Sequence, residues 1–277
     1  MCWNVVNTSD NSYLVVYLAI EILSDRDKLL DAVSVVELKG KYKTSSGLKN
    51  DSLGEYFKIV ARVDNFPGWY FLNADSSTFV SYYMPGIPRE ESSVILEIAR
   101  FKKHLNNMGN QVRLKEKKNI LTMSSTGKTS KIGTWIEHPH SDMITTFSVA
   151  SEDIWFSRET ETPMKWGGQI EFKSNVQMHA RKLKSTMKAC ESISDGTYSF
   201  RLLAGDLIVS SNSHYESYSE KFENVGSGDD ASVQFTGPIH QAFSNEEINI
   251  HFNNDELIVI VSPTAKVVRA PVIETGD

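Results

Sequence analysis

Hydrophobic and polar residues alternate with a period of two along most of the chain, and Gly, Asn and Asp interrupt the pattern at short intervals. A period of two places successive side chains on opposite faces of an extended strand, so the pattern predicts a protein built mainly from β-strands. The turn-forming runs Ala204-Gly205-Asp206 and Asn253-Asn254-Asp255 each separate two of these strands. The predicted strands are 13–22, 56–63, 69–72, 79–84, 94–98, 112–117, 120–124, 143–150, 169–173, 198–203, 207–211, 215–222, 232–235, 247–252, 257–261 and 267–269.

A few segments follow the helical period instead. The run Ser24-Asp25-Arg26-Asp27 has the spacing of a capping box and precedes the first of them. Gly109 is a natural stop for the second helix, and Ser174 is the predicted cap of the third. The predicted helices are 25–38, 99–108, 176–192 and a short one at 236–244.

These elements follow the order β-α-β-β-β-α-β-β-β twice, and a polar, acidic stretch joins the two halves. Each half has enough strands for a sheet and two helices to cover one face of it. The order therefore predicts an α+β fold of two similar β-α-β-β-β-type domains, with helices on one face and sheets on the other. The predicted boundaries are 1–150 for the first domain, 151–168 for the connector and 169–277 for the second domain.

The composition is that of an ordinary globular protein. Of 277 residues, 40% are hydrophobic and 23% are charged, and the length suggests about two domains. No apolar run approaches the ~18 residues of a membrane-spanning helix, so we expect no membrane partner. Two cysteines, Cys2 and Cys190, are too few for a disulfide framework or a four-cysteine zinc site. This cysteine content predicts a reducing, intracellular environment.

The basic residues are segregated, which the net charge of −6 hides. The segments 100–108 and 178–188, each within a predicted helix, carry basic residues and no acid, while the rest of the chain is strongly acidic. This distribution argues against general binding of polyanions and needs a specific explanation. The bases are Arg100, Lys102 and Lys103 in the first segment, and Arg181, Lys182, Lys184 and Lys188 in the second.

Candidate chemistry is sparse. The run Glu137-His138-Pro139-His140-Ser141-Asp142 resembles a metal site, because two histidines and carboxylates can bind zinc, but Pro139 indicates a turn and no third histidine is close. Residues 124–129 end in Gly-Lys-Thr but lack the earlier glycine of a phosphate-binding loop. Cys190 falls on the apolar stripe of a helix and is expected in the core. We therefore predict no catalytic residue, no metal site and no cofactor.

Large apolar residues in the polar connector have two interpretations. They pack back on the body of the protein, or they anchor a partner peptide, for which aromatic and Met side chains are suited. Both interpretations stay open for Trp155, Phe156, Met164 and Trp166.

Several runs, taken in order, resemble the DNA sliding clamp family, which comprises proliferating cell nuclear antigen and its archaeal and viral relatives. Asp75-Ser76-Ser77 stands where this family has a Met-Asp-Ser-Ser-His-Val-like turn between two strands. Residues 94–109 are similar to its second basic helix, and residues 169–222 are similar to the start of its second domain. The tail Ala270-Pro271-Val272-Ile273-Glu274 is close to an Ala-Pro-Lys-Ile-Glu ending. Three departures are the longer loop 40–53, a short fourth helix without lysine and an unusual stretch, 135–142, before the connector.

This resemblance implies a ring-forming sliding clamp, a polymerase processivity factor and not an enzyme, located in a prokaryotic cytoplasm or a eukaryotic nucleus. The implied partners are double-stranded DNA without sequence preference, a DNA polymerase, a clamp loader, other proteins with clamp-binding peptides, and copies of the chain in a homotrimer. Strands near 143–150 and 212–219 would join the subunits. The implied DNA-binding residues are Arg100, Lys102, Lys103, Arg181, Lys182, Lys184 and Lys188, and the implied partner-binding residues are Ile154, Trp155, Met164, Pro271, Val272 and Ile273.

The alternative is a monomeric β-rich module. It would be a metal-dependent hydrolase that uses His138, His140 and Asp142, or a non-replicative adaptor. Oligomeric mass separates the two hypotheses, because a trimeric clamp has three times the 31.2 kDa of one chain.

Overall fold

The computed structural model describes residues 20–37, 41–44, 47–50, 55–63, 67–75, 77–135, 165–166, 170–193, 197–237 and 239–272. The first half of the chain contains two helices and ten strands in this description. They are β1 (Glu21–Asp25), α1 (Arg26–Val36), β2 (Lys41–Thr44), β3 (Gly47–Asn50), β4 (Tyr56–Arg62), β5 (Gly68–Ala74), β6 (Thr78–Pro85), β7 (Ser92–Glu97), α2 (Ile98–Asn106), β8 (Gln111–Lys117), β9 (Ile120–Ser125) and β10 (Lys128–Gly133).

The second half has a related order of elements, with one α-helix and one 3-10 helix, which is labelled η3. Its described elements are β11 (Lys165–Trp166), β12 (Ile170–Glu171), β13 (Ser174–His179), α5 (Ala180–Glu191), β14 (Thr197–Leu203), β15 (Asp206–Asn212), β16 (Ser217–Phe222), β17 (Gly226–Gly228), β18 (Ala231–Thr236), η3 (Ile239–Ala242), β19 (Glu247–Phe252), β20 (Ile258–Val261) and β21 (Ala265–Arg269).

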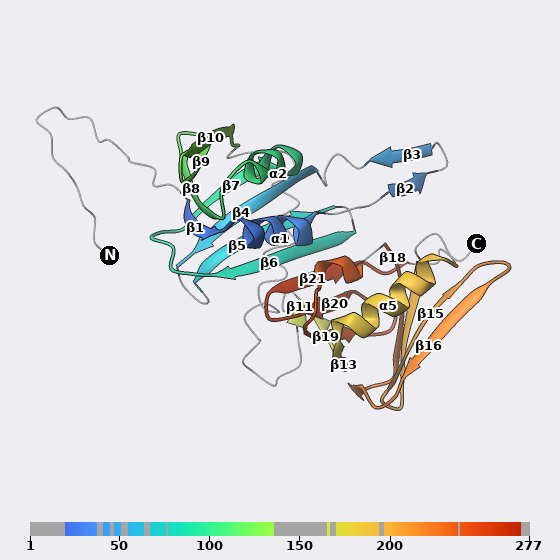
Figure 1. Cartoon of the computed structure of the whole chain (residues 1–277). Coiled ribbons are helices and arrows are strands. Elements are labelled where there is room, and N and C mark those ends of the chain that lie inside the picture. The colour runs from blue at the N-terminus through green and yellow to red at the C-terminus, as the bar shows by residue number, and fades with distance from the viewer. Residues whose placement is uncertain are drawn as a thin grey trace, which may run out of the picture.

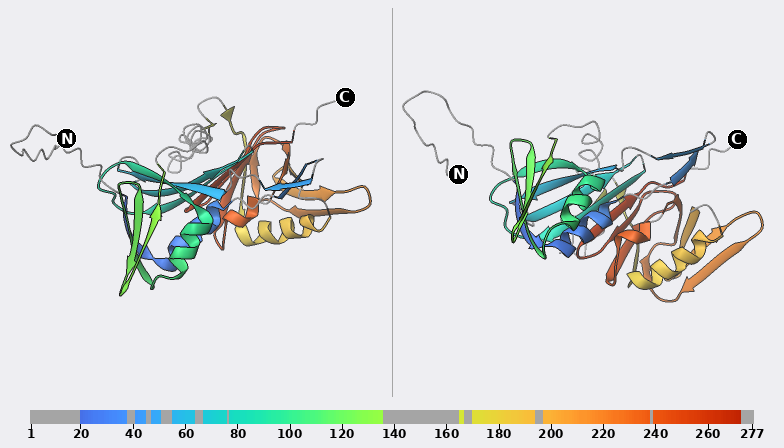
Figure 2. Two further views of the ribbon diagram at one scale, coloured as in Figure 1. Left: turned by 90° about the horizontal axis from the view of Figure 1, so that it is seen from above. Right: turned by 45° about the horizontal axis from the view of Figure 1, so that its top comes forward.

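A nine-stranded antiparallel sheet joins the two halves, in the order β17-β13-β19-β20-β21-β6-β5-β4-β7. The junction is the pair β21 and β6, in which Val267 stands opposite Val80. Two four-stranded sheets, β1-β8-β9-β10 and β16-β15-β14-β18, lie toward opposite ends of the molecule (Figure 1). The helices α1, α2 and α5 all lie on the same side of the nine-stranded sheet (Figure 2, left). This arrangement is the predicted α+β fold, with helices on one face and sheets on the other.

Apolar packing fixes each helix on its sheet. Phe101 of α2 is fully buried and meets Phe57 of β4 edge to face, with ring centroids 5.2 Å apart. On α5, Leu183, Met187 and Cys190 are buried, as the apolar stripe in the sequence predicts. Burying one such side chain contributes roughly 2 kcal/mol to stability. This energy holds the apolar face of each helix against its sheet and leaves the opposite, basic face exposed.

The Asp75-Ser76-Ser77 turn has a clear structural role at the end of β5. One carboxylate oxygen of Asp75 accepts hydrogen bonds from the backbone N–H of Ser77 (2.8 Å) and of Thr78 (2.7 Å). The adjacent Asn73 donates to the carbonyl of Val36 at 2.9 Å, which ties the end of α1 to the same strand. The carboxylate of Asp75 thus closes the β5–β6 turn.

The predicted third helix begins later than expected. Residues 174–179 form β13, which pairs with β17 and β19, so the sheet overrides the helical period there. The cap is His179, whose Nδ1 accepts from the backbone N–H of Arg181 at 3.2 Å, and not Ser174. Likewise α1 starts after Asp25, which makes no side-chain cap hydrogen bond. The fourth predicted helix is the short η3.

Two hairpins were not expected. β2 and β3 pair within the predicted loop 40–53. β10 follows β9 through a tight turn in which Gly127 has a φ of +71°, a conformation that glycine adopts without strain. The predicted strand 143–150 lies outside the described residues, as do residues 13–19 of the first predicted strand. The domain boundaries stay a prediction, because most of the predicted connector also lies there.

Candidate nucleic-acid interface

The three bases of α2 differ in their surroundings. Arg100 forms an ion pair with Glu97 (2.8 Å), and its side chain is 62% exposed. Lys102 forms an ion pair with Glu37 at the end of α1 (2.8 Å), with only 23% of its side chain exposed. Lys103 is exposed on the side opposite the buried Phe101, and no carboxylate pairs with it in the described part of the chain. One of the three bases is therefore fully available to an anion.

The four bases of α5 are more accessible. Arg181, Lys182 and Lys188 are exposed and Lys184 is partly buried. Within the described residues, no carboxylate lies within ion-pair distance of any of them, whereas both Arg100 and Lys102 on α2 have such a partner. The helix therefore presents an uncompensated row of cations, which can contact phosphate groups without reading bases.

The other two helical elements add little positive charge. On α1, Lys28 and Arg26 are accompanied by Asp27 and Asp31, and Arg26 pairs with Asp27. On η3, burial, together with the charges of Lys184 and Lys188, lowers the pKa of His240 to about 4. Glu191 lies 3.7 Å from His240 but does not offset this burial, so the imidazole is neutral at neutral pH. Among the described helices, an excess of positive over negative charge is therefore found on α2 and α5.

Both basic helices are tied to a strand at an edge of a four-stranded sheet. His104 of α2 shares a hydrogen bond with Ser130 of β10, and Lys128 of β10 donates to the carbonyl of Asn107 at 2.9 Å. Thr186 of α5 donates to Glu220 of β16. The hydroxyl of Tyr218 on β16 donates to the same carboxylate at 2.9 Å, and this bond raises its pKa. Each basic helix thus has a fixed position beside an edge strand.

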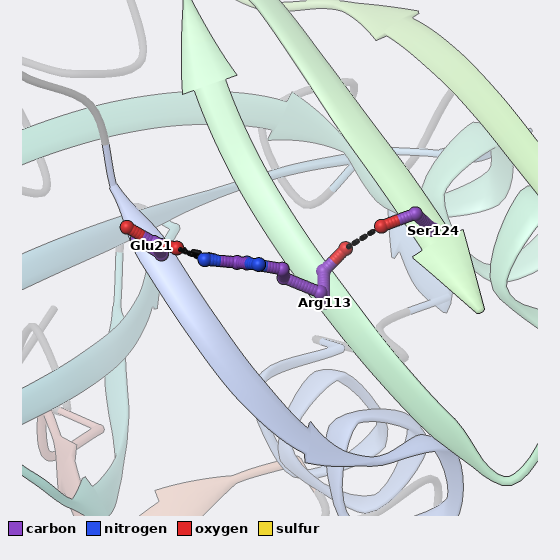
Figure 3. Close-up of polar contacts among 3 residues, drawn as sticks. All are labelled: Glu21, Arg113 and Ser124. Carbon is purple, nitrogen blue, oxygen red and sulfur yellow. Dashed lines mark hydrogen bonds and ion pairs between the residues drawn. The ribbon is translucent and has the colours of Figure 1, made fainter. Parts of the chain in front are cut away.

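The face of the first end sheet that points away from α2 carries a different set of charges. Arg113 on β8 donates to Glu21 on β1 at 2.8 Å, and Ser124 on β9 donates to the carbonyl of Arg113 at 3.5 Å (Figure 3). The guanidinium holds the pKa of Glu21 below its usual value. Lys115 and Lys117 are exposed on this same face, because Val112 and Leu114 point inward. Substitution of these two lysines removes positive charge without changing the helical face, and it therefore serves as a control for substitutions on that face.

The predicted partner surface is only partly described. Pro271 and Val272 are partly buried, and the N–H of Val272 donates to the carbonyl of Gln234 on β18 at 2.7 Å. The N–H of Ala270 donates to the carbonyl of Ser77 at 2.8 Å. The tail therefore runs from the β5–β6 turn to β18. The other predicted residues, Ile154, Trp155, Met164 and Ile273, lie outside the described residues.

The residues of the alternative hydrolase site are not part of the described structure. His138, His140 and Asp142 lie outside the described residues, and within these no three His, Cys, Asp or Glu side chains gather to hold a metal ion. Cys190 is fully buried, and burial raises its pKa to about 11, so its thiol stays protonated at neutral pH. In the same described part, no helix is both long and apolar enough to cross a membrane.

The strand β10 was not predicted from the sequence. Lys, Thr, Ser and Gly make up most of this strand, and this composition is more typical of a turn. One feature of the sequence does indicate this strand. Ser125-Thr126-Gly127-Lys128 has the composition of a hairpin turn, and Ile132, which follows it, is buried.

Comparison with protein-family models and with curated protein sequences finds no match. Solved structures match over nearly the whole chain. PCNA from A. fulgidus, in a structure with the C-terminal region of FEN-1 bound, gives a TM-score of 0.66 at 14% identity and covers 93% of this chain and 100% of that chain. The DNA polymerase III β subunit from Thermotoga maritima gives 0.65 at 14% identity and covers 93% of this chain but 66% of its own. A PCNA2–PCNA3 complex from Sulfolobus tokodaii gives 0.62 at 16% identity, covering 91% of this chain and 99% of that chain.

The chain is thus a two-part α+β protein whose helices share one face of a continuous sheet. Its fold is that of the DNA sliding clamps, which confirms the resemblance found in the sequence. At these identities the matches establish the fold alone.

Proposed function

We propose that this chain is a ring-forming DNA sliding clamp, a non-catalytic processivity factor that encircles duplex DNA inside the cell. The observation that carries the proposal is the pairing of a basic helix with an edge strand at each end of the molecule: α2 with β10, and α5 with β16. The clamp fold supports it, because structures of PCNA and of the polymerase III β subunit match this chain over 93% of its length.

Ring closure would join β10 of one copy to β16 of the next. An edge strand leaves backbone N–H and C=O groups available for a further strand. β10 carries Lys128 and Lys131 and no acid. β16 carries both Glu220 and Lys221, and Lys221 pairs with Glu223 just after the strand. Two different edges give a head-to-tail contact, which closes into a ring when the rotation allows. We propose a homotrimer. In this proposal β10, and not the strand expected at residues 143–150, joins one subunit to the next.

Inside such a ring, the bases of α2 and α5 would face the DNA backbone. Arg181, Lys182, Lys184 and Lys188 would contribute most, with Lys103 and Arg100 from α2. Phosphate contacts position a protein on DNA without sequence preference, which suits movement along the duplex. Lys102 would contribute least, because Glu37 compensates its charge.

Partner proteins would bind at the tail and connector. The structure of A. fulgidus PCNA holds the C-terminal region of FEN-1, which supports peptide recognition by this fold. For this chain, we propose that Pro271, Val272 and Ile273, with Ile154, Trp155 and Met164, receive peptides of a DNA polymerase, a clamp loader and other clamp-binding proteins. Apolar anchors of such peptides need an apolar receiving surface.

Molar mass by light scattering tests the ring. The wild-type chain should give about three times 31.2 kDa. Thr129→Pro on β10 and Ser219→Pro on β16 should each give single chains, because proline removes an N–H donor from the edge and cannot continue a ladder. The matched variants Thr129→Val and Ser219→Val keep the N–H and should keep the wild-type mass. A wild-type mass of one chain would contradict the proposal and favour a monomeric adaptor.

A further inference from the structure

We infer that the phosphate-binding site of this protein is divided between copies: α2 of one copy and α5 of the next form one basic cluster at each subunit junction. This inference rests on the head-to-tail ring proposed above. It adds that a single copy holds only two separated half-sites, so that duplex binding depends on the junctions and not on the total charge of the helical face.

The order of the helices along the face separates the two half-sites within one copy. α1 packs against α2 and against η3, and η3 packs against α5, so the order is α2, α1, η3, α5. The basic helices are therefore at the two ends of the row. Between them stand α1, whose charges balance, and η3, whose His240 is neutral. Within one copy, no basic residue of α2 adjoins one of α5.

On α2, the bases near the edge strand are the ones with access to a neighbouring copy. His104 contacts Ser130 of β10, and Arg100 precedes His104 by one helical turn, so both lie on the side of α2 toward β10. Lys103 points away from the sheet. Lys102 points the other way, to Glu37 at the end of α1.

α5 has the corresponding arrangement. Thr186 contacts Glu220 of β16, and Lys182 precedes Thr186 by one turn, so Lys182 lies on the side of α5 toward β16. Arg181 and Lys188 point away from the sheet, opposite the buried Leu183. Pairing of β10 with β16 would therefore place Arg100 and Lys103 of one copy beside Arg181 and Lys182 of the next.

Mixed rings test this arrangement directly. One variant removes the α2 half-site (Arg100→Gln with Lys103→Gln), and the other removes the α5 half-site (Arg181→Gln with Lys182→Gln). Both lose two positive charges per copy. A ring made of one variant has no complete junction. Any ring that contains both variants has at least one junction where an intact α2 meets an intact α5, although its total charge is unchanged.

The measurement is duplex DNA affinity of rings purified through two different tags, with composition verified by native mass spectrometry. We expect mixed rings to bind about threefold or more tightly than either parent ring, with a steeper salt dependence. An affinity between those of the two parents would overturn the divided site while leaving the clamp proposal intact. The variant Lys115→Gln with Lys117→Gln loses the same charge from the opposite face and should bind like wild type.

Other outcomes separate this inference from the function on which it rests. A wild-type mass of one chain would overturn both the ring and the divided site. Wild-type rings without salt-dependent duplex binding would overturn DNA encirclement, and the divided site with it. The divided site alone would be refuted if wild-type rings bind duplex DNA and the mixed rings have an affinity between those of the two parent rings.

Discussion

The two basic helices, α2 and α5, have the same signature in the sequence and different electrostatic surroundings in the structure. Each is a short amphipathic helix without an acid in its basic segment. On α2, Glu97 pairs with Arg100 and Glu37 pairs with Lys102. On α5, no base has an ion-pair partner among the residues that the structure describes. The surface that can attract phosphate is therefore unequal at the two ends of the molecule.

This difference shows that a local pattern of charges in the sequence does not predict which basic residues are paired with acids in the folded protein. Glu37 stands 65 positions before Lys102 in the sequence, and it reaches this lysine only because α1 and α2 pack side by side. A count of bases in a segment cannot detect such a partner. Partly buried pairs of this kind fix one helix against another, whereas exposed, unpaired cations remain available to a ligand.

The strongest test of this comparison neutralises α5. Changing Arg181, Lys182 and Lys188 to Gln should weaken duplex binding on the order of ten- to a hundredfold at low salt, because phosphate contacts are lost. Each lost contact should also make the slope of log affinity against log salt shallower by about 0.9. Fluorescence anisotropy over a salt series measures both quantities. Retention of the wild-type slope would show that these cations do not meet phosphates. The Lys115→Gln, Lys117→Gln variant serves as the charge control.

A second test compares two neighbours on α2. Lys103→Gln should lower duplex affinity a few-fold and leave the unfolding free energy unchanged, since Lys103 is exposed. Lys102→Gln should do the reverse: it should lower the unfolding free energy by about 1 kcal/mol through loss of the Glu37 pair and change affinity less. Denaturant unfolding and anisotropy on the same two variants suffice. Equal losses of affinity would mean that Lys102 leaves Glu37 when DNA binds.

The order of elements was predictable from the sequence because it depends on local periodicity. Strands such as β4, β14 and β19 alternate cleanly, and the stripe of Leu183, Met187 and Cys190 fixes the buried face of α5. The start of α5 was not predictable, because residues 174–179 are held as β13 by two neighbouring strands from later in the chain. β10 was missed because its pairing with β9, and not its composition, makes it a strand.

The candidate site was predictable only as a list of bases. The sequence gives their position on a helix, and hence which are exposed, but not the acids that approach them from elsewhere. It also gives no indication that Ser130 and Glu220, one on each edge strand, hold the two helices in place. These contacts arise from tertiary packing between segments that are far apart in the chain.

The smallest expected effect distinguishes the two ends by pH. Because burial lowers the pKa of His240 to about 4, the unfolded chain, with a pKa of 6.5, binds a proton first as the pH falls. Stability contributed by the neutral His240 is therefore complete above pH 6.5 and declines as the pH falls from there toward 4. Between pH 7 and pH 6 the loss should be under about 1 kcal/mol for this group. His240→Gln should lose less stability over that interval than wild type, and hydrogen exchange should show the wild-type loss in α5, against which η3 packs, more than in α2. A pH dependence identical in wild type and variant would mean that His240 does not control this end of the molecule.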